Sequence, residues 1–74
     1  MWTTGNILVK GKVVAYTVKH FEEGSDFGID GGKISKLSLK VNGKIAANYD
    51  RGWDVRPKDA ISKEAYKILL KKYN

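Results

Sequence analysis

Aromatic and cationic side chains around residue 50 are the part of this 74-residue sequence best suited to binding another molecule. Tyr49, Arg51 and Trp53 are alternate residues of one segment, and alternate residues of a regular strand share a face. A guanidinium between two aromatic rings can stack on nucleobases or anchor a protein partner. In the alternative interpretation Tyr49 and Trp53 are core residues, and Arg51 pairs with Asp50, Asp54 or a loop carboxylate.

Other charged residues could contribute to the same binding. Lys36 and Lys40 share the outward side of a predicted strand, where lysines bind phosphates as point charges. Asp30 lies near the end of a glycine-rich, acidic segment, residues 22–32, and Lys33 follows directly after it. This segment is either an ordered binding loop or a plain connection. The candidate set for binding a macromolecule is Tyr49, Arg51, Trp53, Lys36, Lys40, Asp30 and Lys33.

Catalysis and metal binding have little basis in the sequence. His20 is the only histidine and cysteine is absent, so a zinc site lacks ligands. No serine lies in a Gly-x-Ser-x-Gly context, and the glycine-rich segment does not match a phosphate-binding loop. A calcium loop begun at Asp26 fails because its third place is Gly28 and its twelfth is Leu37. We expect no catalytic residue, no cofactor and no metal.

The composition is that of a small basic globular domain. Fourteen Lys and Arg against eight Asp and Glu give a net charge of +6. This charge either attracts polyanions or, as lysine often does, keeps a small domain soluble and its sheet edges unpaired. Without cysteine, a secretory start or an apolar run of membrane-spanning length, we expect one domain over residues 1–74, in the cytoplasm, with no membrane contact.

Turn signals divide the first 57 residues into strands. Apolar runs at 6–10 and 13–21 flank Gly11, which predicts a β-hairpin. Runs at 33–41 and 44–49 flank Asn42-Gly43, the sequence typical of a type I′ turn. Residues 49–57 either continue the fourth strand or leave it through a bulge at Gly52. We also expect Phe27 and Ile29 to tuck back onto the core.

A helix is predicted after Pro57, with Asp59 or Ser62 as its N-cap. Its apolar residues recur at helical spacing, and Lys63, Lys67 and Lys71 occupy the opposite side. The predicted fold is α+β, a four-stranded antiparallel sheet of two β-hairpins with a C-terminal α-helix packed on one face.

Segments 22–25, 28–37 and 48–54 resemble a family of short uncharacterised proteins encoded by Gram-positive bacteria and their phages. The resemblance spans nearly the whole chain. It implies a single domain and, because the family has no assigned activity, transfers no functional residue. In element order alone, the chain is also similar to the four-strand-then-helix unit of coactivator-like and Whirly-like single-stranded DNA binders.

The function expected from these observations is that of a noncatalytic binding module, a bacterial or phage accessory protein. It would engage a macromolecule through the uncovered sheet face and the glycine-rich loop. A protein partner leads, nearly tied with nonspecific binding of single-stranded DNA or RNA to a basic, aromatic-containing sheet face. A homodimer formed through a strand edge is a third possibility.

Overall fold

Two tight turns build most of the sheet. In the computed structural model, which describes residues 1–74, Lys10 and Gly11 join β1 (Trp2–Val9) to β2 (Lys12–His20). Asn42 and Gly43 join β3 (Ile34–Val41) to β4 (Lys44–Asp50) in the same way. All four turn residues have positive φ, between 50° and 79°, as a type I′ turn requires. The two hairpins predicted from the sequence are confirmed.

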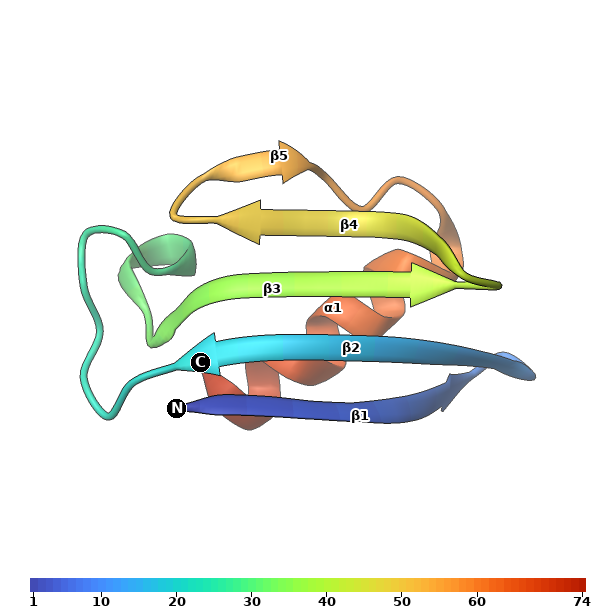
Figure 1. The fold of residues 1–74 in the computed structure, drawn as a ribbon, viewed down its shortest axis with the longest axis horizontal. Coiled ribbons are helices and arrows are strands. Elements are labelled where there is room, and N and C mark those ends of the chain that lie inside the picture. Colours follow the sequence, from blue (N-terminus) through green and yellow to red (C-terminus); the bar gives the residue numbers. More distant parts are fainter.

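The strands form one antiparallel sheet in the order β1-β2-β3-β4-β5, and α1 (Ala60–Tyr73) runs obliquely behind it (Figure 1). The short 3₁₀ helix η1 (Ile29–Gly31) lies in the long connection between β2 and β3. Both ends of the chain lie at the same end of the sheet, the end that also carries this connection. The α+β architecture with a helix on one face is therefore as predicted.

The expectation of four strands was wrong, because the sheet has a fifth strand, β5 (Trp53–Val55). The chain neither continues β4 nor bulges at Gly52. It reverses over residues 50–52, where Arg51 has a φ of 59° and the Asp50 N–H donates to the Gly52 carbonyl at 2.9 Å. Trp53 consequently lies opposite Tyr49. Positive φ is uncommon for arginine, so a turn centred there has no clear sequence signal.

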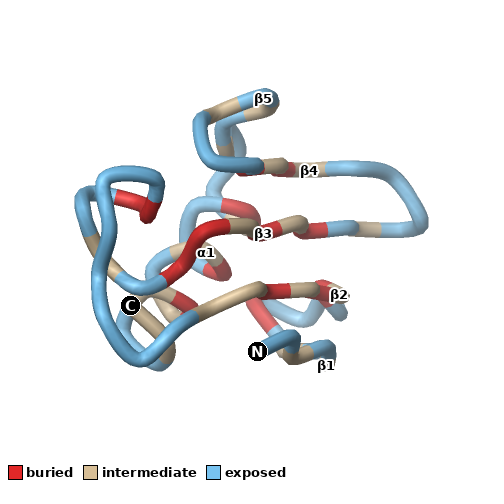
Figure 2. Tube along the Cα trace, turned by 60° about the vertical axis from the view of Figure 1, so that its left-hand side comes forward, coloured by how far each residue is buried: buried red, intermediate tan, exposed pale blue.

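The core lies between the helix and one face of the sheet (Figure 2). Alternate residues of the central strands supply it, as their period-two pattern predicted: Val14, Tyr16 and Val18 from β2, with Leu37 and Leu39 from β3. Ala65 and Leu69 of α1 are fully buried against them. Burying one such leucine contributes roughly 1.5–3 kcal/mol, so this layer holds the sheet and helix together.

The helix begins directly after Asp59, one of the two residues predicted as its N-cap. Asp59 Oδ1 accepts a hydrogen bond from the Ser62 N–H at 2.7 Å, and this bond lowers the pKa of the Asp59 carboxyl. Lys63, Lys67 and Lys71 are exposed on the far side of α1, as expected. No helix of the structure has the length and apolar character needed to cross a bilayer.

The connection from β2 to β3 is held in place by Asn74. Its side-chain oxygen accepts from the Ile34 N–H at 2.9 Å, and its amide donates to the Ile29 carbonyl at 3.1 Å. Gly32 passes so close that a Cβ there would collide with the Asn74 amide group. Ile29 is buried, as expected, but Phe27 is 52% exposed. The expectation that Phe27 packs on the core was wrong, since the backbone turn that buries Ile29 directs Phe27 outward.

Candidate functional site

The helix leaves one face of the sheet uncovered, and the strand register places its side chains in cross-strand rows. We call this surface the open face. One row crosses it as Trp2, Lys19, Lys36 and Asp50, one residue from each of four neighbouring strands. The next row holds only hydroxyl and amide side chains: Thr4, Thr17, Ser38 and Asn48. The open face thus has a charged and aromatic row beside a small, polar one.

Exposed aromatic side chains gather where β1, β2 and the loop after β2 meet. Trp2 is 55%, Phe21 48% and Phe27 52% exposed. Burying aromatic rings is a main source of folding free energy, so three rings left in solvent at one end of a small domain suggest a surface made for contact. We call these rings, together with Lys19, Lys36 and Arg51, the aromatic end of the open face.

Each of these rings has a cation beside it. The Lys19 ammonium lies 5.6 Å from the ring centroids of both Trp2 and Phe21. The Arg51 guanidinium lies 4.1 Å from the centroid of Phe27. Such distances are within the range of cation–π attraction, which at an exposed site contributes about 0.5–1 kcal/mol. The cations therefore hold the rings in place without removing them from solvent.

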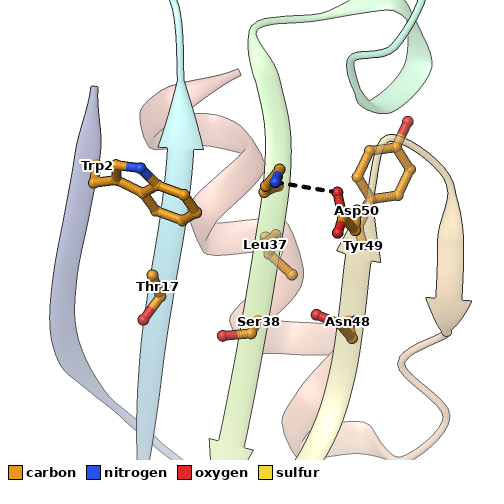
Figure 3. Close-up of a pocket in the computed structure, with 8 residues that line it drawn as sticks. Trp2, Thr17, Leu37, Ser38, Asn48, Tyr49 and Asp50 are labelled. Carbon is orange, nitrogen blue, oxygen red and sulfur yellow. Dashed lines mark ion pairs between the residues drawn. The ribbon is translucent and has the colours of Figure 1, made fainter.

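Two adjoining hollows give the aromatic end its shape, and Lys36 lines both. The first, of about 320 Å³, is bordered by Trp2, whose indole reaches from β1 over β2, and by the Lys36–Asp50 ion pair with its N–O distance of 3.5 Å (Figure 3). The second, of about 280 Å³, lies between Phe21, Phe27 and Arg51. Together they could accept side chains or bases of a bound partner.

The opposite end of the open face is aliphatic. Leu8 and Val13, which pair directly across β1 and β2, are 70% and 60% exposed, and Ile45 is 50% exposed. Ile45 reaches this face because β4 has a bulge that places it opposite Lys40. Isolated exposed aliphatic residues are ordinary, but a directly paired Leu8 and Val13 at the edge of a sheet form a small apolar patch.

The structure does not bring Tyr49, Arg51 and Trp53 onto one face. Tyr49 is only 7% exposed, and Trp53 packs edge-on against it at 5.1 Å and against Tyr66 of α1 at 5.3 Å. Both rings face the helix. The predicted shared face was wrong, because it required a regular strand and the chain reverses at Arg51. Arg51 alone of the three is exposed toward the aromatic end, where it contacts an aromatic ring instead of a carboxylate.

The other candidate residues are divided between two surfaces. Lys36 and Lys40 lie on the open face. Asp30 lies away from it, in a hollow of about 350 Å³ shared with Trp53 and residues of α1. Lys33 is exposed next to β3, and its carbonyl accepts from the Phe21 N–H at 3.0 Å. The glycine-rich loop thus contributes to the aromatic end through Phe27 and not through Asp30.

Sequence reasoning missed Trp2, Lys19, Phe21 and Phe27 as surface candidates. A signal was present for two of them, because Lys19 has the same parity as the outward Thr17, and Trp2 has the parity of Thr4 and Asn6. Extending the first strand back to residue 2 would have placed Trp2 and Lys19 side by side. The outward direction of Phe27 had no local signal.

No three His, Cys, Asp or Glu side chains come together as a metal-ion site would require. Burial raises the pKa of Tyr66, and the hydrogen bond between the Tyr16 and Tyr73 hydroxyls raises the pKa of Tyr16, but both rings lie on the helix side of the sheet. These pKa shifts therefore concern the helix side of the sheet and not the open face.

The comparisons agree with a family that has no assigned activity. The family model of a domain of unknown function, DUF7678, matches residues 1–74. No curated protein and no solved structure matches the chain. The match supports the uncharacterised family indicated by the sequence resemblance and leaves the surface of the molecule as the guide to function.

Proposed function

This chain belongs to the family of the domain of unknown function DUF7678, and from its surface we propose that it is a small noncatalytic module that binds a protein partner through the open face. The observation that carries this proposal is the aromatic end. Three half-exposed rings and Arg51 lie around two hollows on the face that the helix leaves uncovered.

The residue types at the aromatic end are those that dominate protein interfaces. Trp and Arg are enriched among residues that lose the most affinity when truncated, and aromatic residues are enriched in interface cores. The charges here are also mixed, because Glu22, Glu23 and Asp26 are exposed in the loop between Phe21 and Phe27. A mixed surface of this kind suits a partner segment that offers apolar side chains together with positive charge.

The loop that carries Phe27 is ordered in the unbound chain. The Tyr49 hydroxyl donates to the Phe27 carbonyl at 2.9 Å, and Asn74 holds the following residues through Ile29 and Ile34. Ordering a loop costs free energy on binding, so a loop that is held beforehand improves affinity. This arrangement favours a binding role for the loop over that of a plain connection.

Affinity capture with matched variants tests the proposal. Wild-type chain, Phe27→Ala, Phe21→Ala and Lys67→Ala would each be immobilised and exposed to the same lysate of a Gram-positive host. We expect one or more proteins to be enriched by wild type and by Lys67→Ala, which alters only the far side of α1, and to be lost with both phenylalanine variants. Equal recovery by all four chains, or recovery of nothing above background, would reject the proposal.

Single-stranded nucleic acid is the second candidate, favoured by the cation beside each exposed ring and by the net charge of +6. Bases stack on aromatic rings with about 1–3 kcal/mol each, and phosphate contacts make the affinity fall steeply with salt. Fluorescence anisotropy with labelled oligo-dT and oligo-U across a salt series tests this. Affinity that weakens with salt and with Phe27→Ala supports it, and absent or salt-insensitive binding rejects it.

The cellular setting belongs to the same proposal. The sequence resemblance extends to short proteins of Gram-positive bacteria and their phages, so we place the chain in the cytoplasm of such cells as an accessory protein. Its partner would then be a bacterial or phage protein present in that compartment.

A further inference from the structure

Strand β1 presents an unpaired row of backbone groups. Met1 and His20 exchange two hydrogen bonds, each of 2.9 Å, and antiparallel strands alternate between such pairs and pairs without hydrogen bonds. It follows that Thr3, Gly5 and Ile7 direct their backbone groups toward β2. Trp2, Thr4, Asn6 and Leu8 direct theirs away from the sheet, and all four of these residues are exposed.

Nothing in β1 protects this edge. Edge strands that remain unpaired usually carry lysine or another charge, a proline or a bulge, or are very short. β1 is eight residues long, WTTGNILV, with no charged residue, no proline and no register shift against β2. The other edge of the sheet differs in each respect, because β5 has three residues, contains Asp54 and is followed closely by Pro57.

We propose that a second copy of this chain pairs with β1 edge to edge, antiparallel and about a two-fold axis at Gly5, so that Trp2 of each copy lies opposite Leu8 of the other. In this register Thr4 lies opposite Asn6 of the second copy. Four outward residues on each strand are then paired, and each pair exchanges two hydrogen bonds, about eight in all. If the register shifts by two residues in either direction, Trp2 or Leu8 no longer lies opposite a residue of the second copy's β1.

A shift by one residue is ruled out by side-chain direction. It would pair outward-directed backbone groups with groups already bonded to β2, and would turn one copy's helix to the opposite side of the sheet. At the proposed axis the two Gly5 residues face each other and offer no side chain that could collide. The register is therefore the one that uses the whole exposed edge of both copies.

The side chains of the two copies also match. Trp2, 55% exposed, takes the position opposite Leu8, 70% exposed, and Thr4 takes the position opposite Asn6, so apolar positions pair with apolar and polar with polar. Because Leu8 is already beside Val13, the aliphatic patch of one copy adjoins the aromatic end of the other. The pairing joins two open faces into one continuous surface and gives the exposed Trp2 and Leu8 positions partners in the second copy.

Cysteine cross-linking tests the register directly, since the chain has no cysteine of its own. Opposed residues of a hydrogen-bonded pair have Cα atoms about 5.5 Å apart, which a disulfide can bridge. We expect a mixture of Thr4→Cys and Asn6→Cys chains to form a cross-linked dimer under mild oxidation, whereas Thr4→Cys alone stays uncross-linked. Efficient linking of Thr4→Cys alone, or none in the mixture, would overturn the proposed pairing.

Sedimentation equilibrium tests the assembly itself. We expect a concentration-dependent mass rising toward about twice 8.3 kDa. Thr4→Pro removes an outward N–H without affecting the bonds to β2 and should weaken the dimer by about tenfold or more. Asn6→Lys should also weaken the dimer. Its control is Thr17→Lys, which places a lysine on the same open face but on the interior strand β2, opposite Thr4. Monomer at all concentrations, or equal effects of Asn6→Lys and Thr17→Lys, would refute the inference.

Discussion

The guanidinium of Arg51 lies 4.1 Å from the centre of the Phe27 ring. This contact joins the turn between β4 and β5 to the loop between β2 and β3, two segments separated by more than twenty residues of sequence. It leaves Phe27 half-exposed. Arg51 can reach the ring because it lies in the turn after β4 and not within a regular strand. The contact therefore shapes one side of the aromatic end.

Replacing Arg51 by alanine should lower partner affinity more than stability. The cation–π contact is exposed, so its loss should reduce the free energy of unfolding by no more than about 1 kcal/mol. Binding measured by calorimetry with a captured partner should weaken by about tenfold, as expected for an interface arginine. Arg56→Ala is the matched control, because Arg56 stacks on Trp53 instead. Similar losses for the two variants would argue against the aromatic end.

The two tryptophans should differ in quenching by iodide. Trp2 lies on the open face, whereas Trp53 is half-buried between Tyr49 and Tyr66. We expect Trp53→Phe, which retains Trp2 alone, to show clearly stronger quenching and redder emission than Trp2→Phe. The dilution should be high enough to keep the chain monomeric. Comparable quenching of both indoles would contradict the assignment of Trp53 to the helix side.

Removing the Asn74 side chain should loosen the glycine-rich loop. Asn74→Ala leaves the Ile34 N–H without its partner, while the Ile29 carbonyl keeps only its bond from the Gly32 N–H at 2.8 Å. This should cost about 1–3 kcal/mol of stability. Urea unfolding measures this loss, and amide hydrogen exchange should rise at Ile34. Lys72→Ala, an exposed change in the last helical turn, should have little effect. Unchanged exchange at Ile34 in Asn74→Ala would show that the loop is held by other contacts.

The helix cap should make stability depend on pH in the acid range. Hydrogen bonding to Ser62 lowers the folded-state pKa of Asp59 below its ordinary value of 3.8. The stabilisation is therefore fully present above the unfolded-state pKa and is lost as the pH falls through the folded-state pKa. Thermal unfolding from pH 7 to pH 2 should show a smaller acid decrease in Asp59→Asn, which retains a capping oxygen, than in wild type. Identical pH profiles would refute this assignment.

The strands and the helix could be predicted because their signals are local. Asn42-Gly43 determines a turn through the positive φ that both residues accept, and the alternation of Leu37, Leu39 and Val41 identifies the buried side of its own strand. Asp59 caps the helix through the backbone three residues away. Each of these features depends on neighbours within a few residues, so a single sequence contains the necessary information.

The open face could be predicted only in part. The outward direction of Lys36 and Lys40 follows from strand parity, and the structure agrees with it. Trp2 and Lys19 required the pairing of two strands in a known register. The sequence alone could not predict which cation lies beside which aromatic ring, because turn geometry and bulges determine the cross-strand neighbours.

Only the tertiary structure decided where Tyr49, Trp53 and Phe27 point. An arginine at positive φ reverses the chain at residue 51, so Trp53 returns opposite Tyr49 and packs between Tyr49 and Tyr66 of the helix. Phe27 is turned outward because Tyr49 and Asn74, far along the chain, bind the backbone around it. Local patterns identified the apolar residues of this protein, but contacts between distant segments determined which of them became surface.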